Sequence, residues 1–322
     1  MGRLLTIMTC QWTDLELEVM CRKAKEMGYD GLELACWGNH LDAKRVVEDD
    51  SYFQEVMDLL KKYDLKCEAL STHIIGQCVG DYNDPRLNNF APDELADQPE
   101  AIRAWAVETM KYAALAAKTG FTGSPIWKYL YSFPQTTEEM IEAGYQEIYD
   151  LWSPILDVFA ENGIQFALEV HPGEIAFDYY STKRLLEKFK DRPEFGLNFD
   201  PSHLIWQGVT PHLFLQDFAD RIYHVHMKDA AVTLDGRSGL LGSHIDFGDL
   251  RRGWNFRSLG HGDVNFEEII RVLNAVGYEG PLSVEWEDSG MEREYGAKQA
   301  AEFVRGIDFK ASDIKFDDAI AN

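Results

Sequence analysis

The chain has 322 residues, 31 basic and 55 acidic, so its formal net charge is −24. Binding to nucleic acid or to an anionic membrane depends on clustered Lys and Arg, and the sequence offers only short pairs such as 61–62 and 251–252. We therefore expect neither nucleic acid nor a membrane as a partner. The length suits one large α/β domain.

The cysteines predict a reducing compartment. There are five, an odd number, and none forms a CxxC pair, which argues against both a disulfide framework and a thiolate zinc site. The N-terminal apolar run is too short for a signal peptide or a membrane span. We therefore expect a cytoplasmic protein with free thiols at Cys10, Cys21, Cys36, Cys67 and Cys78.

Along the chain, short apolar runs alternate with longer helical stretches. This alternation predicts a parallel sheet with crossover helices, and eight repeats predict closure into a single (β/α)8 TIM barrel. An open doubly wound sheet is the alternative, but no GxGxxG or P-loop follows the first run. The eight predicted strands are 4–12, 31–37, 66–74, 120–127, 165–171, 195–200, 222–228 and 282–287.

The helices are predicted from apolar spacing and from their end signals. The first begins at Asp14 as N-cap and stops at Gly28. Pro154 should kink or split the third helix. The barrel should occupy residues 1–306, and a C-terminal tail, 307–322, should wrap its outside. The predicted helices are 14–28, 98–120, 136–163, 265–280 and 292–306.

One connection, 229–264, is unusually long for a compact domain. It carries Trp254, Phe256, Arg251 and Arg252, which favours an ordered lid over the mouth of the barrel. The alternative is a peripheral excursion with a small core of its own.

Polar residues end four consecutive predicted strands. In an α/β barrel these carboxyl ends meet at the catalytic face. Several carboxylates at one point would repel each other unless they were protonated or shared a cation. The four positions are Glu169 with His171 and Glu174, Asp200 with His203, His224 with His226, and Glu285 with Glu287.

A divalent metal ion would resolve that repulsion. Oxygen donors with one imidazole suit Mn²⁺, Mg²⁺ or Co²⁺, while Zn²⁺ is also possible. We choose His226 over His224 because it lies nearer the strand end, and Glu285 over Glu287, which should sit at the rim. Each residue also has a plain alternative, since a carboxylate can pair with Lys or Arg and a histidine can simply pack. The alignment of all four favours the metal.

The segments "ALEVHPG", "NFDPSHL", "HVHMKD" and "SLGHGDVNFEEIIRVLNAVGYEGPLSVEWED" resemble the xylose isomerase-like TIM-barrel superfamily, within it the sugar phosphate isomerase/epimerase group. The resemblance covers essentially the whole barrel. It implies Glu169, Asp200, His226 and Glu285 as metal ligands, with His203 beside the substrate. A dimer or tetramer is also a family-level expectation.

The resemblance implies proton transfer beside a sugar carbonyl. A metal on the carbonyl and neighbouring hydroxyl oxygens stabilises the enediolate, and Glu169 and Glu285 could serve its opposite faces as catalytic bases. The outcome would be epimerisation, isomerisation or, with loss of a β-leaving group, elimination.

The sequence departs from the simple ketose epimerases after His226. Those enzymes have a short connection with a substrate-binding arginine, whereas here Lys228 and Asp229 lead into the long loop. Arg251, Arg252 and His261 are candidates for the arginine's role. A metal-dependent lyase or dehydratase acting on a keto-sugar, 3-keto-glycoside or keto-inositol is therefore the alternative function.

The predicted substrate is a small sugar. Aromatic and polar side chains at strand ends should shape its pocket, because aromatic faces stack on sugar rings. Core filling is the alternative role for each Trp. An apurinic-site endonuclease and a non-catalytic sugar-binding protein are the less favoured classes. The expected substrate contacts are His203, His73, Trp37, Trp127, His171, Lys228 and Arg252.

Overall fold

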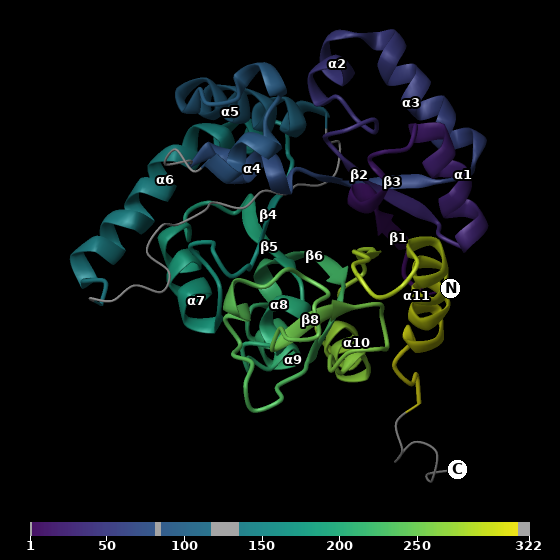
Figure 1. Cartoon of the computed structure of the whole chain (residues 1–322). Helices are drawn as coiled ribbons and strands as arrows, with labels where there is room; N and C mark the ends of the chain where they lie inside the picture. Colours follow the sequence, from purple (N-terminus) through teal and green to yellow (C-terminus); the bar gives the residue numbers. More distant parts are fainter. Residues whose placement is uncertain (1, 81–84, 117–134, 315–322) are drawn as a thin grey trace.

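The computed structural model describes residues 2–80, 85–116 and 135–314. Its core is a curled parallel sheet of seven strands in the order β3-β2-β1-β9-β6-β5-β4, with the helices arranged around it (Figure 1). This is the predicted TIM-barrel architecture. The predicted strand 120–127 lies outside the described residues. The strands are β1 Leu5–Met8, β2 Gly31–Ala35, β3 Lys66–Ser71, β4 Phe166–Glu169, β5 Phe195–Phe199, β6 Ile222–Met227 and β9 Leu282–Val284.

The strands are apolar because helices cover one face of the sheet and the barrel interior covers the other. Every residue of β1, β2, β4 and β5 is buried, as expected for parallel strands enclosed on both faces. The predicted strands that fall within the described residues all run past the observed carboxyl ends, and two of them run into helices. Residues Thr9–Trp12 form a short 3-10 helix, and α4, His73–Val79, begins directly after β3.

The predicted helices are present, with ends that differ by a few residues, and the predicted stop of the second helix at Gly120 lies outside the described residues. The N-cap position of α1 is Glu16 rather than Asp14, without a capping hydrogen bond from its side chain, and Gly28 ends the helix with a positive φ of 97°. Pro154 lies inside α6 without ending it, because Trp152, Ile155 and Leu156 bury that face of the helix against the core. The bounds are α1 Leu17–Met27, α5 Pro99–Ala116, α6 Glu138–Glu161, α10 Phe266–Ala275 and α11 Arg293–Ile307.

Further helices complete the wall. They are α2 Ala43–Glu48, α3 Asp50–Lys62, α7 Tyr179–Lys188, α8 Ser202–Ile205 and α9 Pro211–Asp217. After α11, Asp308 pairs with Arg3 and the Phe309 carbonyl accepts a hydrogen bond from Asn274. Within the described ranges, no helix combines the length and apolar character that crossing a bilayer requires.

The long connection contains an antiparallel hairpin that the sequence did not predict. β7, Asp229–Val232, pairs with β8, Trp254–Arg257, so that Asp229 stands opposite Arg257. Trp254 stacks on Trp206 at a centroid distance of 4.4 Å. The loop is therefore ordered around aromatic contacts of its own and is anchored to the segment after α8.

Asp229 fastens the two ends of this loop together. Its carboxylate accepts hydrogen bonds from the backbone amides of Ala230 and Val264 at one oxygen, and from those of Gly260 and Gly262 at the other. A side chain at Gly262 would place its Cβ 2.2 Å from Asp229 Oδ1, so glycine is required there. The carboxylate thus fixes where the loop leaves and re-enters the barrel.

Replacing Asp229 by Asn should destabilise the protein. In either orientation the new amide would point its NH₂ group at two backbone N–H donors and leave them unpaired, which should lower the free energy of unfolding by about 2 kcal/mol. Urea unfolding followed by circular dichroism measures this, with Asp246→Asn, an exposed position in the same loop, as the control. Equal midpoints for the two variants would contradict the clamp.

Candidate functional site

A cavity of about 580 Å³ opens at the carboxyl ends of the strands. Carboxylates, imidazoles, one ammonium group and aromatic side chains line it. The long loop contributes Phe247, Gly248 and Phe256 to its wall. Among the predicted site residues, those at the wall are Trp37, His73, Glu169, His171, His203, Lys228 and Glu285.

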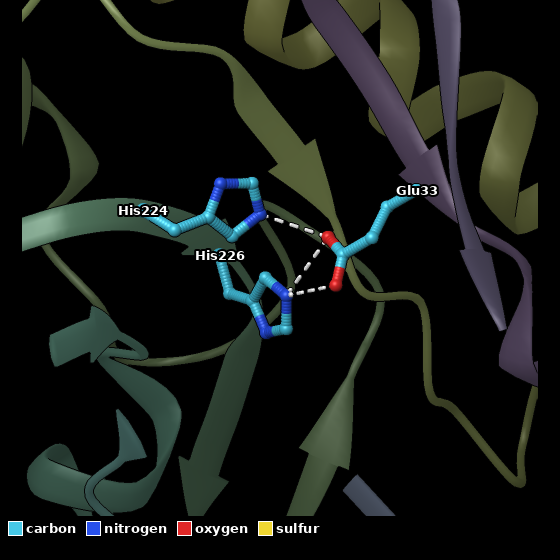
Figure 2. Close-up of side chains that lie close together, drawn as sticks. All are labelled: Glu33, His224 and His226. Atoms are coloured by element: carbon cyan, nitrogen blue, oxygen red, sulfur yellow. Dashed lines mark hydrogen bonds and ion pairs between the residues drawn. The ribbon is translucent and has the colours of Figure 1, made fainter. Parts of the chain in front are cut away.

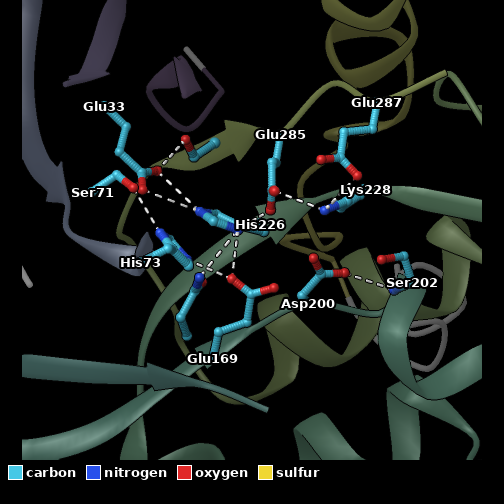
Figure 3. A network of polar contacts seen from close by, with 12 residues as sticks. Glu33, Ser71, His73, Glu169, Asp200, Ser202, His226, Lys228, Glu285 and Glu287 are labelled. Atoms are coloured by element: carbon cyan, nitrogen blue, oxygen red, sulfur yellow. Dashed lines mark hydrogen bonds and ion pairs between the residues drawn. The ribbon is translucent and has the colours of Figure 1, made fainter. Parts of the chain in front are cut away.

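The structure brings the four predicted metal ligands together. One ligand atom from each of Glu169, Asp200, His226 and Glu285 lies within 4.8 Å of the others, and all four residues are buried. Figure 3 shows their side chains pointing into a common space. They come from the ends of β4, β5, β6 and β9, which are neighbours in the sheet. Strand topology therefore accounts for the cluster.

The donor set fits a divalent cation. Asp200 Oδ2 is buried and accepts no hydrogen bond, and Glu285 Oε2, 2.8 Å from His226 Nδ1, points into the same cluster, so carboxylate oxygens face the space where a cation would bind. Three carboxylates with one imidazole are ligands that Mn²⁺ and Mg²⁺ accept, and no cysteine belongs to the group. Metal binding itself stays a prediction.

Two histidines hold Glu169. His73 Nε2 lies 2.5 Å from Glu169 Oε2, and His203 Nε2 lies 2.7 Å from Oε1. Burial opposes ionisation of this carboxyl, but the two imidazoles outweigh it and keep the pKa of Glu169 well below its usual range. Ser71 Oγ, 2.6 Å from His73 Nδ1, fixes the His73 ring in turn. Glu169 is therefore an oriented carboxylate ion.

Lys228 neutralises Glu285. Its Nζ donates to Glu285 Oε1 at 2.7 Å, lies 3.2 Å from Glu287 Oε2 and stands 4.3 Å from the centre of the Phe256 ring. Burial opposes ionisation of Glu285, but Lys228 and then His226 outweigh it and lower the pKa of Glu285 to about 2. The same pairing holds the pKa of Lys228 well above its usual value despite burial. The ammonium is a fixed cation at the cavity wall.

His171 is a neutral imidazole in the same cavity. Burial lowers its pKa to about 3. Its Nδ1 lies 2.7 Å from the carbonyl oxygen of Pro172, so Nδ1 carries the proton and Nε2 keeps a lone pair. The ring packs against His203 at a centroid distance of 4.2 Å. A neutral His171 can accept a hydrogen bond through Nε2.

Sequence reasoning missed Glu33. This residue lies in the middle of β2 and is 0 % exposed. Its carboxylate faces both histidines of β6, with Oε2 2.8 Å from His224 Nε2 and both oxygens within 3.2 Å of His226 Nε2 (Figure 2). A charged residue inside an otherwise apolar strand was the available signal. It could not show which residues Glu33 would meet.

The remaining predicted contacts fall elsewhere. Arg252 does not line the cavity. Its guanidinium donates to the Ile245 carbonyl at 2.6 Å and stacks on Phe247 and Trp254, so its contacts lie within the loop. Trp127 is outside the described residues. Glu287 lies at the cavity wall, where Gln11 donates to it at 3.2 Å.

Comparison with known proteins identifies the family to which this fold corresponds. The family model described as xylose isomerase-like TIM barrel matches residues 21–307. The chain belongs to this family. It is 25% identical over 304 residues to the uncharacterized protein YfiH of Bacillus subtilis, covering 90% of this chain and 95% of that protein. It is 32% identical over 133 residues to an inosose dehydratase of Clostridium perfringens, a match that spans 39% of this chain and 42% of that enzyme.

Solved structures show the same fold. A probable 3-DHS dehydratase, AsbF from Bacillus anthracis, superposes with a TM-score of 0.66 at 18% identity, covering 94% of this chain and 98% of that chain. The 3-keto-D-glucoside 4-epimerase YcjR from E. coli has a TM-score of 0.66 at 16% identity, covering 94% and 99%. Proteins of this fold thus include a probable dehydratase and an epimerase.

Glu174 is a second buried carboxyl near the site. It is 1 % exposed, and its Oε2 accepts no hydrogen bond. Burial, and then the negative charge of Glu169, raise the pKa of Glu174 well above its usual value. The folded protein therefore binds this proton more tightly than the unfolded chain, where a Glu titrates near about 4.3.

This difference predicts that the Glu174 contribution to the free energy of unfolding decreases as pH rises. The contribution of protonated Glu174 is complete below the unfolded pKa and is lost as pH rises toward the folded pKa. Without bound metal, Glu174→Gln should therefore have a higher free energy of unfolding than the unmodified protein, and this difference should grow from pH 5 to pH 8 by up to about 1.4 kcal/mol per pH unit. Urea unfolding across this range measures it, with exposed Glu147→Gln as the control. A difference independent of pH would rule the effect out.

Proposed function

We propose that the chain is a divalent-metal-dependent sugar isomerase or epimerase that moves a proton on the carbon beside a sugar carbonyl. The supporting observation is that Glu169 and Glu285 belong to the four-residue cluster and also line the cavity. The same carboxylates can therefore reach both a cation and a substrate.

The chain's own groups suit proton transfer. When bound, a divalent cation supplies a Lewis acid that polarises a carbonyl and stabilises negative charge developing beside it. Glu169 and Glu285 are ionised, which is the state that accepts a proton. His73 and His203 hold Glu169 in place, and Phe247 and Phe256 form an apolar wall that limits the entry of water.

Mn²⁺ or Mg²⁺ is the proposed metal, with Co²⁺ or Zn²⁺ also compatible with the donor set. Mixed carboxylate and imidazole ligands favour the harder ions, since the group contains no thiolate. The proposed substrate is a small sugar that carries a ketone. The cavity is lined by the aromatic side chains of Trp37, Phe247 and Phe256, and such faces can stack on a sugar ring.

A lyase or dehydratase is the second candidate, and Lys228 favours it. Its ammonium group lies at the cavity wall next to Glu285, where it can donate a hydrogen bond to a departing hydroxyl and offset the negative charge that develops there. Local similarity to inosose dehydratases points the same way. Keto-inositols and 3-keto-glycosides are the substrates to test.

Deuterium exchange separates the two reactions. The Mn²⁺-loaded protein is incubated in D₂O with ketohexoses, 3-keto-glycosides and keto-inositols. Deuterium beside the carbonyl with the skeleton retained is the expected result for an isomerase or epimerase, whereas an unsaturated product indicates a lyase.

Removal of either carboxylate tests the assignment. Glu169→Gln and Glu285→Gln should each lower the exchange rate by about 10²- to 10⁴-fold, because each removes a proton acceptor. Glu279→Gln, an exposed position, is the matched control. Absence of exchange with every substrate, together with unchanged metal content in both site variants, would refute the proposal.

A further inference from the structure

We infer that Glu33 is a positioning residue that fixes the tautomer of His226, so that Nδ1 is the atom His226 offers to the cation. This inference rests on the metal centre proposed above. It concerns a residue outside the cavity wall, and it assigns a purpose to the carboxylate buried inside the barrel.

The two ring nitrogens of His226 face different surroundings. Nε2 lies 3.2 Å and 3.1 Å from the two oxygens of Glu33. Nδ1 faces the cluster, 2.8 Å from Glu285 Oε2 and 3.8 Å from Glu169 Oε2. An ionised carboxylate can only accept, so Nε2 must carry the hydrogen. Nδ1 faces Glu285 in the same way, so both nitrogens can carry a hydrogen when no cation is bound. A cation in the cluster would replace the hydrogen on Nδ1, while Glu33 would keep the one on Nε2, so the lone pair would lie on the side of the cluster.

Glu33 is itself held in one orientation. Ser283 Oγ on β9 donates to Glu33 Oε2 at 2.7 Å, and His224 Nε2 on β6 lies 2.8 Å from the same oxygen. Because β1 stands between β2 and β9 in the sheet, the Glu33 side chain reaches across the barrel interior to make these contacts. In Figure 2 it points from β2 directly at both imidazoles. The carboxylate therefore cannot turn without breaking several hydrogen bonds.

A second cation site made by Glu33, His224 and His226 is the competing interpretation, since their ligand atoms also lie close together. The contacts argue against it. These groups already join one another at 2.8 to 3.2 Å, which are ordinary hydrogen-bond lengths. Asp200, in contrast, keeps a buried oxygen, Oδ2, that accepts no hydrogen bond, and this residue belongs to the cluster on the Nδ1 side of His226. The unmet demand for a cation lies on the Nδ1 side of His226.

Carboxylates that receive the second N–H of a ligating histidine orient the ring and increase its basicity. Losing such a partner typically lowers metal affinity about 10- to 100-fold. Glu33 is the residue on β2 that meets this description, and His224 and Ser283 hold it in place. The expected effect is on metal affinity and on the tautomer, before any effect on turnover.

The test compares Glu33→Gln with Glu68→Gln, a half-buried glutamate on β3. Titration calorimetry with MnCl₂ should show a Kd about 10- to 100-fold weaker for Glu33→Gln and unchanged for Glu68→Gln. Two-bond ¹H–¹⁵N spectra of the Mg²⁺-loaded protein should show His226 protonated at Nε2, and this signature should be lost or mixed with the other tautomer in Glu33→Gln.

Ser283→Ala provides a second, milder variant if Glu33→Gln fails to fold. It removes only the hydroxyl that holds Glu33, so a weaker Kd by about 5-fold is expected, the equivalent of one hydrogen bond. If the unmodified protein binds no Mn²⁺, the proposed function fails. If it binds one Mn²⁺ and neither variant changes the Kd or the His226 tautomer, the role of Glu33 is refuted and the proposed function stands.

Discussion

The mutual repulsion of three buried carboxylates is the constraint on which the site depends. Glu169, Asp200 and Glu285 come from three strand ends and converge within a few ångströms. Burying such charges without partners is strongly unfavourable, by several kcal/mol for each ion. The barrel makes the convergence unavoidable, because parallel strands bring their carboxyl ends to one face. The surrounding residues are best understood as the means by which this repulsion is offset.

The three carboxylate charges are not offset equally, and the difference indicates where a cation would bind. Glu169 is held by two imidazoles and Glu285 by Lys228 and His226, and both stay ionised. The imidazole nearest to Asp200, that of His203, lies 3.4 Å from Oδ2, farther than the cationic partners of the other two carboxylates, so burial raises the pKa of Asp200 to about 6. Deeper in the barrel, Glu33 accepts a hydrogen bond from Nε2 of His226, the ring nitrogen that faces away from the three carboxylates. Above the carboxylates, the long loop supplies aromatic walls. A divalent ion in the middle would complete the charge balance.

Much of this arrangement could be predicted from local signals. Glu169 and Asp200 each end an apolar run, and the alternation of strands and helices specifies that such ends meet. Glu33 could not be assigned, because its partners on β6 lie about 190 residues away and depend on how the barrel closes. The hairpin of β7 and β8 was not predicted because its two four-residue strands are separated by a long polar segment. Arg252 was placed by residue type alone, whereas its observed contacts depend on that hairpin.

Anomalous diffraction from a crystal soaked in MnCl₂ tests the central claim most directly, because it locates the ion without requiring a substrate. The account predicts one Mn²⁺ peak per chain, bonded to Glu169, Asp200, Glu285 and Nδ1 of His226 at about 2.0 to 2.3 Å. No peak among these four residues, or a peak bonded instead to Glu33 and the Nε2 atoms of His224 and His226, would contradict it.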